Sequence, residues 1–124
     1  MISVIIPVLN EEATIASVVQ FASQCPNVSE VIVVDDKSID NTVNEAIAAG
    51  AKVITSTRLG KGASMKDGLL VSMNEIIVYL DGDINPYPAK TIELLTAPLL
   101  NDEADFCKAT FSRQAGRVTE LVAK

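Results

Sequence analysis

Residues 76–83 read Ile-Ile-Val-Tyr-Leu-Asp-Gly-Asp, an apolar run that ends in two carboxylates one residue apart. The run is short and rich in β-branched residues, which predicts a buried strand over residues 76–80. Asp81 and Asp83 would then lie at the carboxyl end of that strand. Two interpretations are open: a plain strand-ending turn, or a site for a hard cation such as Mg²⁺ or Mn²⁺, which binds carboxylates and substrate phosphates.

Similar apolar runs recur along the chain, and segments of helical period separate them. The runs predict strands over residues 3–6, 31–34, 53–55 and 76–80, and a fifth strand, at an edge of the sheet, over residues 105–111. Strands that alternate with helices are typical of βαβ units. The sequence therefore predicts an α/β fold with a parallel sheet, and its 124 residues fit a single domain.

Four helices are predicted between the strands. Their apolar positions are Ile15, Val18, Val19 and Ala22 for the first, Val43, Ala46 and Ile47 for the second, Met65, Leu69 and Met73 for the third, and Ile92 and Leu95 for the fourth. Ser38 or Asp40 is the expected N-cap of the second helix, and Gly50 is the residue expected to follow its end. Pro98 is expected to end or kink the fourth helix. Residues 116–124 are also expected to be helical.

Composition excludes several classes of function. The chain has no histidine, which excludes Ser-His-Asp catalysis and histidine-based zinc sites within these residues. A net charge of −6 offers no basic surface to nucleic acid or to an anionic membrane. Cys25 and Cys107 are isolated, as expected of buried thiols in a reducing cytoplasm. Pro7 interrupts the apolar run at residues 2–9, so we expect neither a signal peptide nor a membrane span.

Polar residues follow each of the four predicted parallel strands. They occupy residues 7–12, 35–40, 56–62 and 81–83. Ligands of open α/β sheets bind at the carboxyl ends of the strands, so acidic groups are expected to converge there. Alternatives remain open at two places. Asn10 could cap the first helix, whose dipole would favour Glu11 and Glu12. Asp35 and Asp36 could form a solvated turn, or accept hydrogen bonds from a base or a ribose.

Lys61 lies between two glycines, Gly60 and Gly62, at the start of the third predicted helix. The spacing is not that of an ATP-binding P-loop. The glycines still allow a ligand to approach closely. A lysine at a helix N-terminus is unfavourable unless an anion is present. Lys61 is therefore predicted to contact a phosphate or a base.

Taken in order, these motifs resemble the nucleotide-sugar-binding half of GT-A glycosyltransferases. The resemblance is carried by residues 4–12 (Val-Ile-Ile-Pro-Val-Leu-Asn-Glu-Glu), 32–36, 38–42 and 81–83. Residues 60–62, 81–88, 98–100 and 116–124 more specifically resemble glucosyl- and mannosyl-3-phosphoglycerate synthases. The resemblance implies a three-layer α/β/α fold with a mostly parallel, Rossmann-like sheet. It also implies that residues 1–124 form the donor half of the domain, without the acceptor-binding half.

The resemblance implies roles for individual residues. Pro7, Leu9 and Glu11 would line the base and ribose pocket, Asp36 would lie beside the nucleotide, and Lys61 would contact it. Asp81 and Asp83 would be catalytic: Asp81 would touch the ribose or the metal-diphosphate centre, and Asp83 would ligate Mg²⁺ or Mn²⁺. Gly116, Arg117 and Thr119 match a segment that receives a small anionic acceptor. Without the resemblance, Arg117 would be expected to be a solvated arginine at a helix start.

The implied activity is transfer of a hexose from UDP-glucose or GDP-mannose to a phosphorylated acceptor such as 3-phosphoglycerate, with retention of configuration. One departure concerns residues 112–115, since the family has a longer segment there. Another is the family's metal-binding histidine, which the chain lacks. Three alternatives stay open: an inverting GT-A enzyme such as a polyprenyl-phosphate sugar synthase, a non-catalytic nucleotide-binding module, and a nucleotidyltransferase. The oligomeric state is also open, a homodimer included.

Overall fold

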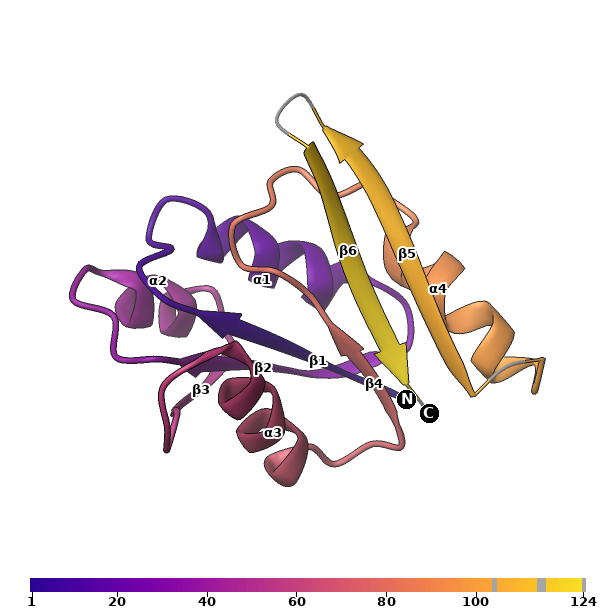
Figure 1. The fold of residues 1–124 in the computed structure, drawn as a ribbon, viewed down its shortest axis with the longest axis horizontal. Coiled ribbons are helices and arrows are strands. Elements are labelled where there is room, and N and C mark those ends of the chain that lie inside the picture. Colours follow the sequence, from indigo (N-terminus) through magenta and orange to yellow (C-terminus); the bar gives the residue numbers. More distant parts are fainter. Residues whose placement is uncertain (104, 114–115, 124) are drawn as a thin grey trace.

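The computed structural model describes residues 1–103, 105–113 and 116–123, and of residues 106–113 and 116–123 it describes the backbone alone. Its strands are β1 (Ile2–Val8), β2 (Val28–Asp35), β3 (Lys52–Thr55), β4 (Ile76–Tyr79), β5 (Phe106–Arg113) and β6 (Gly116–Ala123). They form one sheet in the order β3-β2-β1-β4-β6-β5 (Figure 1). β1 to β4 are parallel, and β6 runs antiparallel to both β4 and β5. The predicted mostly parallel sheet is confirmed, and the edge strand predicted over residues 105–111 is β5, Phe106–Arg113.

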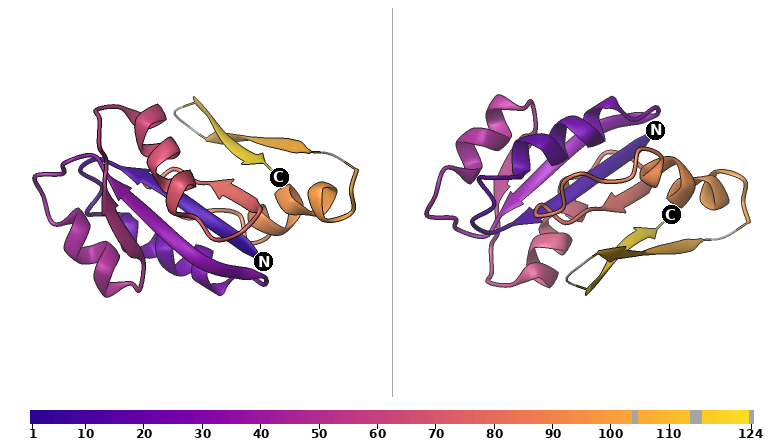
Figure 2. Two further views of the ribbon diagram at one scale, coloured as in Figure 1. Left: turned by 90° about the horizontal axis from the view of Figure 1, so that it is seen from below. Right: turned by 90° about the horizontal axis from the view of Figure 1, so that it is seen from above.

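The helices cover both faces of this sheet. They are α1 (Ile15–Gln24), α2 (Thr42–Ala48), α3 (Lys61–Val71) and α4 (Thr91–Leu100). α3 lies on one face, and α1 and α2 lie on the other (Figure 2). Ile92, Leu95 and Leu99 of α4 join the same apolar cluster as α1. The fold therefore has the three α/β/α layers that were expected.

The apolar face predicted for α1 is confirmed. Ile15, Val18, Val19 and Ala22 are the buried residues of this helix. They pack against β1 residues such as Val4 and Ile6, which are also fully buried. Burial of each large side chain of this kind stabilises the fold by about 1.5–3 kcal/mol. This packing fixes α1 beside the carboxyl end of β1, where the polar loops begin.

The apolar face predicted for α3 is wrong. Leu69 is 48% exposed, and Met73 is 84% exposed and follows the end of the helix. The buried residues of α3 are Ser64 and Gly68. A Cβ atom at Gly68 would lie 2.5 Å from Cγ2 of Ile5. α3 thus packs through small residues because it lies too close to the sheet for larger ones.

Two further expectations are corrected at the carboxyl-terminal side of the chain. Pro98 does not end α4, which continues to Leu100. Leu95 and Leu99 are both buried in the core, and their packing offsets the one backbone hydrogen bond that the proline removes. Residues 116–123 form strand β6 and not a helix. They pair with β4 and β5, and their β-branched residues favour an extended backbone.

Smaller expectations concern α2, the cysteines and membrane spans. The N-cap residue of α2 is Asn41, so the expectation of Ser38 or Asp40 is wrong; Asp40 lies one residue earlier, and its Oδ1 accepts the Thr42 N–H at 3.0 Å. Gly50 follows the C-cap with a φ of 99°, as expected. Cys25 is buried and unpaired, and the side chain of Cys107 lies outside the description. None of the helices in the described part of the chain has the length and apolarity needed to cross a membrane.

Candidate functional site

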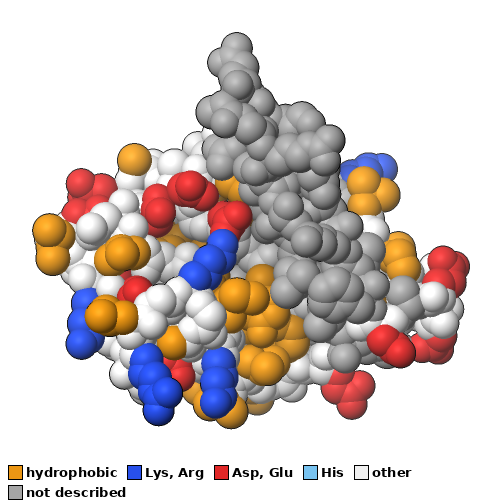
Figure 3. Space-filling view, viewed as in Figure 1, with side chains coloured by type: hydrophobic (Ala, Val, Ile, Leu, Met, Phe, Trp, Pro, Cys, Tyr) orange, Lys and Arg blue, Asp and Glu red, His pale blue; other side chains and the backbone are white. Residues whose placement is uncertain are grey.

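Acidic side chains gather at the carboxyl ends of β1, β2 and β4. In Figure 3 they lie on one face of the molecule, and a basic side chain lies against them. The side chains come from loops that are far apart in sequence, because parallel strands bring their carboxyl ends to one edge of the sheet. The predicted convergence of acidic groups is therefore present.

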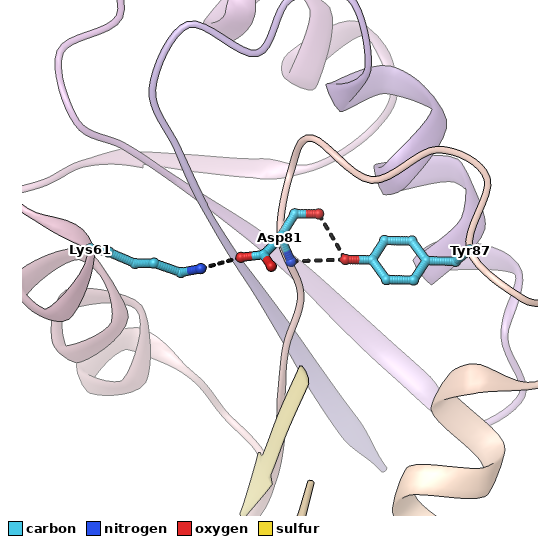
Figure 4. A network of polar contacts seen from close by, with 3 residues as sticks. All are labelled: Lys61, Asp81 and Tyr87. Atoms are coloured by element: carbon cyan, nitrogen blue, oxygen red, sulfur yellow. Dashed lines mark hydrogen bonds and ion pairs between the residues drawn. The ribbon is translucent and has the colours of Figure 1, made fainter. Parts of the chain in front are cut away.

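Asp81 and Lys61 form an ion pair at this edge. Lys61 begins α3, and Asp81 lies two residues beyond β4. The ammonium contacts Asp81 Oδ1; the lysine side chain is 61% exposed and the aspartate side chain 21%. Figure 4 shows Lys61 and Tyr87 on opposite sides of Asp81. Tyr87 accepts a hydrogen bond from the Asp81 N–H and donates one to the Asp81 carbonyl oxygen, both at 2.9 Å.

Gly82 holds the two carboxylates close to the core. A Cβ atom at this position would lie 2.7 Å from Cγ1 of Val8, closer than real Cβ contacts come. Thr14, next to the start of α1, donates its hydroxyl to the Gly82 carbonyl oxygen at 2.6 Å. Asp83 follows and is exposed to solvent. The triplet is therefore packed against β1 and α1, which a plain surface turn would not require.

Glu11 shows how near these acids are to one another. Burial raises the pKa of the Glu11 carboxyl above its ordinary value, and the charges of Asp83, Asp40 and Asp81 raise it further. Its own main-chain N–H donates to Thr42 Oγ1 at 2.8 Å. The loop after β1 is thus tied to the start of α2. Four carboxylates from three loops share one region of negative potential.

Asn10 does not cap α1, because the N-cap residue of this helix is Thr14, so that alternative is wrong. Asn10 has a φ of 55°, and its Oδ1 accepts the Ile39 N–H at 2.9 Å. Glu12 Oε2 accepts the Asn41 N–H at 3.1 Å. Both side chains therefore bind the loop that leads into α2. They cross-link the loop after β1 to the loop after β2, which fixes the position of Glu11 between them.

Asp36 connects the end of β2 to the start of α3. Its Oδ2 accepts the Gly60 N–H at 3.0 Å, one residue before Lys61. Gly60 has a φ of 103°, which only glycine adopts readily. Asp36 Oδ1 is buried and has no hydrogen-bond partner among the described residues. A buried acceptor without a donor is costly, so this oxygen is suited to a ligand N–H or O–H.

The other predicted residues lie on β1, directly after β1, or on β6. Pro7 is half-buried within β1, and Leu9 is 50% exposed just after it; no hydrogen bond within the described chain joins either residue to the acids. Gly116, Arg117 and Thr119 belong to β6, and their side chains lie outside the description. Sequence reasoning gave no role to Tyr87 or Thr14. Both bind the backbone of the Asp81–Gly82 turn, Tyr87 from six positions away and Thr14 from 68, and no local pattern encodes these contacts.

The cluster fits a divalent cation of the Mg²⁺ type. Within the described chain, no three Asp, Glu or Cys side chains are arranged as a preformed metal cage. Mg²⁺ does not need such a cage, since one or two carboxylates, water and substrate phosphates complete its shell. Asp83 is exposed, and a single ammonium offsets the charge of the neighbouring acids. The donor atoms are all oxygens, as this class of ion prefers.

Comparisons with known proteins agree with this geometry. Residues 3–121 match the model of the family described as "Glycosyl transferase family 2". The chain is 38% identical over 149 aligned residues to a glucosyl-3-phosphoglycerate synthase of Mycobacterium tuberculosis; the match covers 99% of this chain and 46% of that protein. The chain thus spans less than half the length of this curated relative.

Solved structures of the Mycobacterium tuberculosis synthase are similar to the described fold. One, in complex with Mn²⁺, UDP-glucose and phosphoglyceric acid, is 39% identical with a TM-score of 0.76, and the match covers 83% of this chain and 40% of that one. Another, with Mg²⁺ and UDP, is 40% identical with a TM-score of 0.74 and coverages of 81% and 39%. From the family match over residues 3–121 and these similarities, the chain belongs to glycosyl transferase family 2.

Proposed function

We propose that residues 1–124 form the nucleotide-sugar-binding half of a glycosyltransferase that moves a hexose to a small phosphorylated acceptor. The observation that carries this proposal is the group of Asp81, Lys61, Asp83 and Glu11 at the carboxyl edge of a family 2 sheet. This group contains carboxylates, which can bind a cation, and an ammonium, which can bind a phosphate. A nucleoside diphosphate-sugar bound with a divalent cation carries both complementary charges.

The donor we favour is UDP-glucose with Mn²⁺ or Mg²⁺. The similar synthase structures contain UDP with Mg²⁺, and UDP-glucose with Mn²⁺ and phosphoglyceric acid. In this chain Asp36 Oδ1, a buried acceptor, would receive an N–H or O–H of the nucleoside. Pro7 and Leu9 would form the apolar wall beside it. GDP-mannose is the competing donor, and binding measurements separate the two.

We assign the carboxylates of Asp81 and Asp83 to the cation and the ammonium of Lys61 to the diphosphate. Asp83 would hold the cation, with Asp81 beside it, and the ion would stabilise the negative charge of the departing nucleoside diphosphate as a Lewis acid. Lys61 exchanges its contact with Asp81 for a phosphate oxygen, which adds a second positive charge. Glu11, whose pKa is raised by burial and then by the neighbouring carboxylates, would accept a hydrogen bond from a ribose hydroxyl.

The acceptor is proposed to be a small anion of the 3-phosphoglycerate kind. This rests on the similarity to glucosyl-3-phosphoglycerate synthase and on the match of Gly116, Arg117 and Thr119 to its acceptor segment. An arginine suits a carboxylate or phosphate group, because its guanidinium can donate two parallel hydrogen bonds.

Isothermal titration calorimetry tests the proposal. UDP-glucose, GDP-mannose and ADP-glucose are titrated into the 124-residue chain, each with Mg²⁺ and with EDTA. We expect heat from UDP-glucose, strengthened by the cation, and weaker or no heat from the other two. Binding of GDP-mannose alone would correct the donor. Binding of none of them would contradict a nucleotide-sugar site.

A further inference from the structure

Tyr87 holds the main chain of Asp81 at two points. Its hydroxyl accepts the Asp81 N–H and donates to the Asp81 carbonyl oxygen, with both distances at 2.9 Å (Figure 4). One residue earlier, the Leu80 N–H still bonds to Ile5 O of β1 at 3.0 Å. Asp81 therefore lies where β4 leaves its neighbour. A tyrosine hydroxyl takes the place that a backbone partner has elsewhere in the sheet.

The tyrosine ring is itself fixed in place. Tyr87 is 6% exposed, and its ring stacks on Phe21 of α1 with centroids 5.2 Å apart and planes inclined by 17°. Thr14, the N-cap residue of the same helix, binds the Gly82 carbonyl oxygen. Side chains anchored on α1 thus hold the carbonyl oxygens of two consecutive residues. The backbone of the turn is connected directly to the apolar core.

The two hydrogen bonds of Tyr87, here called the clamp, hold the backbone of Asp81 and do not involve the carboxylates. The Asp81 carboxylate contacts Lys61 on the side away from Tyr87 (Figure 4), and Asp83 is exposed. A site that must receive a cation gains when its donor atoms are held in place beforehand by supporting contacts. We propose that Tyr87 is a positioning residue: its hydroxyl fixes the Asp81–Asp83 backbone so that the two carboxylates face the cation and diphosphate.

This inference rests on the proposed function, because it assigns Tyr87 to the cation end of that nucleotide site. The proposed role of Tyr87 is specific to the cation end and differs from a general contribution to the stability of the fold. Loss of the hydroxyl should weaken cation binding and leave the nucleoside end of the site unchanged. Asp36 binds the Gly60 N–H, and the loop after β1 is tied to residues 38–42, whereas Tyr87 binds the backbone of Asp81. A purely structural role would instead weaken all ligand binding together.

The test compares Tyr87→Phe with Tyr79→Phe. Both remove one hydroxyl, and Tyr79 lies on β4 in the apolar cluster of the opposite face. Mn²⁺ binding in the presence of UDP is followed by electron paramagnetic resonance, and UDP binding in EDTA by calorimetry. For Tyr87→Phe we expect the apparent Kd for Mn²⁺ to rise about 10-fold, the size usual for outer contacts of a metal site. UDP binding in EDTA should not change, and Tyr79→Phe should match the wild type.

An unchanged Kd for Mn²⁺ in Tyr87→Phe overturns the proposal, as does an equal loss of UDP binding in EDTA. Failure of the wild-type chain to bind UDP and Mn²⁺ at all contradicts the proposed function instead. Hydrogen exchange of the Asp81 amide then tests the clamp by itself, also where the variant does not fold. Slow exchange in the wild type supports the clamp, and exchange at the rate of an exposed amide overturns it.

Discussion

Lys61 on α3 and Asp81 beyond β4 form an ion pair across the carboxyl edge of the sheet, although twenty positions separate them in the chain. Both side chains were expected to meet a ligand, and the structure shows that they meet each other. The ammonium of Lys61 is thus offset by a carboxylate. In the proposed function the diphosphate would replace Asp81 as the partner of Lys61, so the charge of Lys61 should matter for diphosphate binding.

Lys61→Met should weaken UDP binding about 10-fold, because a charge-assisted hydrogen bond to a phosphate is lost at a half-exposed site. The matched control is Lys66→Met, which removes the same charge from the exposed side of the same helix. Calorimetry with UDP and Mg²⁺ measures both. Equal affinities of the two variants would contradict the phosphate contact of Lys61.

Gly68→Ala should destabilise the fold by about 1–3 kcal/mol, the usual cost of overpacking a core. The new Cβ atom would lie 2.5 Å from Cγ2 of Ile5 and 3.1 Å from Cγ2 of Val34. Gly62→Ala in the same helix is the control, since nothing lies within 4 Å of its Cβ position. It should leave stability unchanged or raise it by up to about 1 kcal/mol. Urea unfolding compares them, and a stable Gly68→Ala would disprove the close approach of α3.

The sequence predicted those elements whose packing is encoded by large apolar residues. The β-branched run at residues 31–34 lies within β2, and the face of Ile15, Val18 and Ala22 is buried in α1 as expected. α3 was predicted as a helix but with the wrong buried face, because it packs through Gly68, and the role of a glycine becomes visible only when its neighbour is known. Residues 116–123 were expected to be helical and form β6 instead, because the pairing of β6 with β4 is a long-range contact that these residues do not encode locally.

The candidate site was predicted residue by residue, but its connections were not. Asp81, Asp83 and Glu11 were expected at one edge, since parallel strands end there, and Glu11 is indeed close to both aspartates. The pairing of Asp36 with Gly60 and the clamp of Tyr87 on Asp81 depend on loop geometry. Such contacts join positions without any shared periodicity, so a single sequence does not reveal them.

Acid should weaken the loop before α3 through Asp67. Its carboxylate accepts the Thr57 N–H at 2.8 Å, and this hydrogen bond, helped by the Thr57 hydroxyl, lowers the Asp67 pKa below its ordinary value of 3.8. The folded state therefore favours the carboxylate. Its contribution to stability is full above the ordinary pKa and is lost as the pH falls through the lowered one.

Asp67→Asn should accordingly lose less stability than the wild type between about pH 5 and about pH 2, the range over which such carboxylates take up protons. Urea unfolding at several pH values measures this. Glu103→Gln, at an exposed position after α4, should follow the wild-type pH profile. If the stability of Asp67→Asn showed the same pH dependence as the wild type, the hydrogen bonds between Asp67 and Thr57 would not contribute to the pH dependence of stability.

Gly82→Ala should disturb the Asp81–Asp83 turn, because its Cβ atom would lie 2.7 Å from Cγ1 of Val8. We expect a destabilisation of about 1–3 kcal/mol and weaker Mn²⁺ binding in the presence of UDP. Unfolding and electron paramagnetic resonance measure the two effects. Unchanged Mn²⁺ binding in a folded Gly82→Ala variant would show that the glycine serves packing alone.

The most direct test of the account is the dependence of UDP-glucose binding on Mn²⁺ in Asp83→Asn. Calorimetry of the 124-residue chain, with Mn²⁺ and with EDTA, compares the wild type, Asp83→Asn and the control Glu75→Gln, which removes an exposed carboxylate before the amino end of β4. We predict that Mn²⁺ strengthens binding to the wild type and to Glu75→Gln but not to Asp83→Asn. The same strengthening by Mn²⁺ in Asp83→Asn would contradict a cation site at Asp81-Gly82-Asp83.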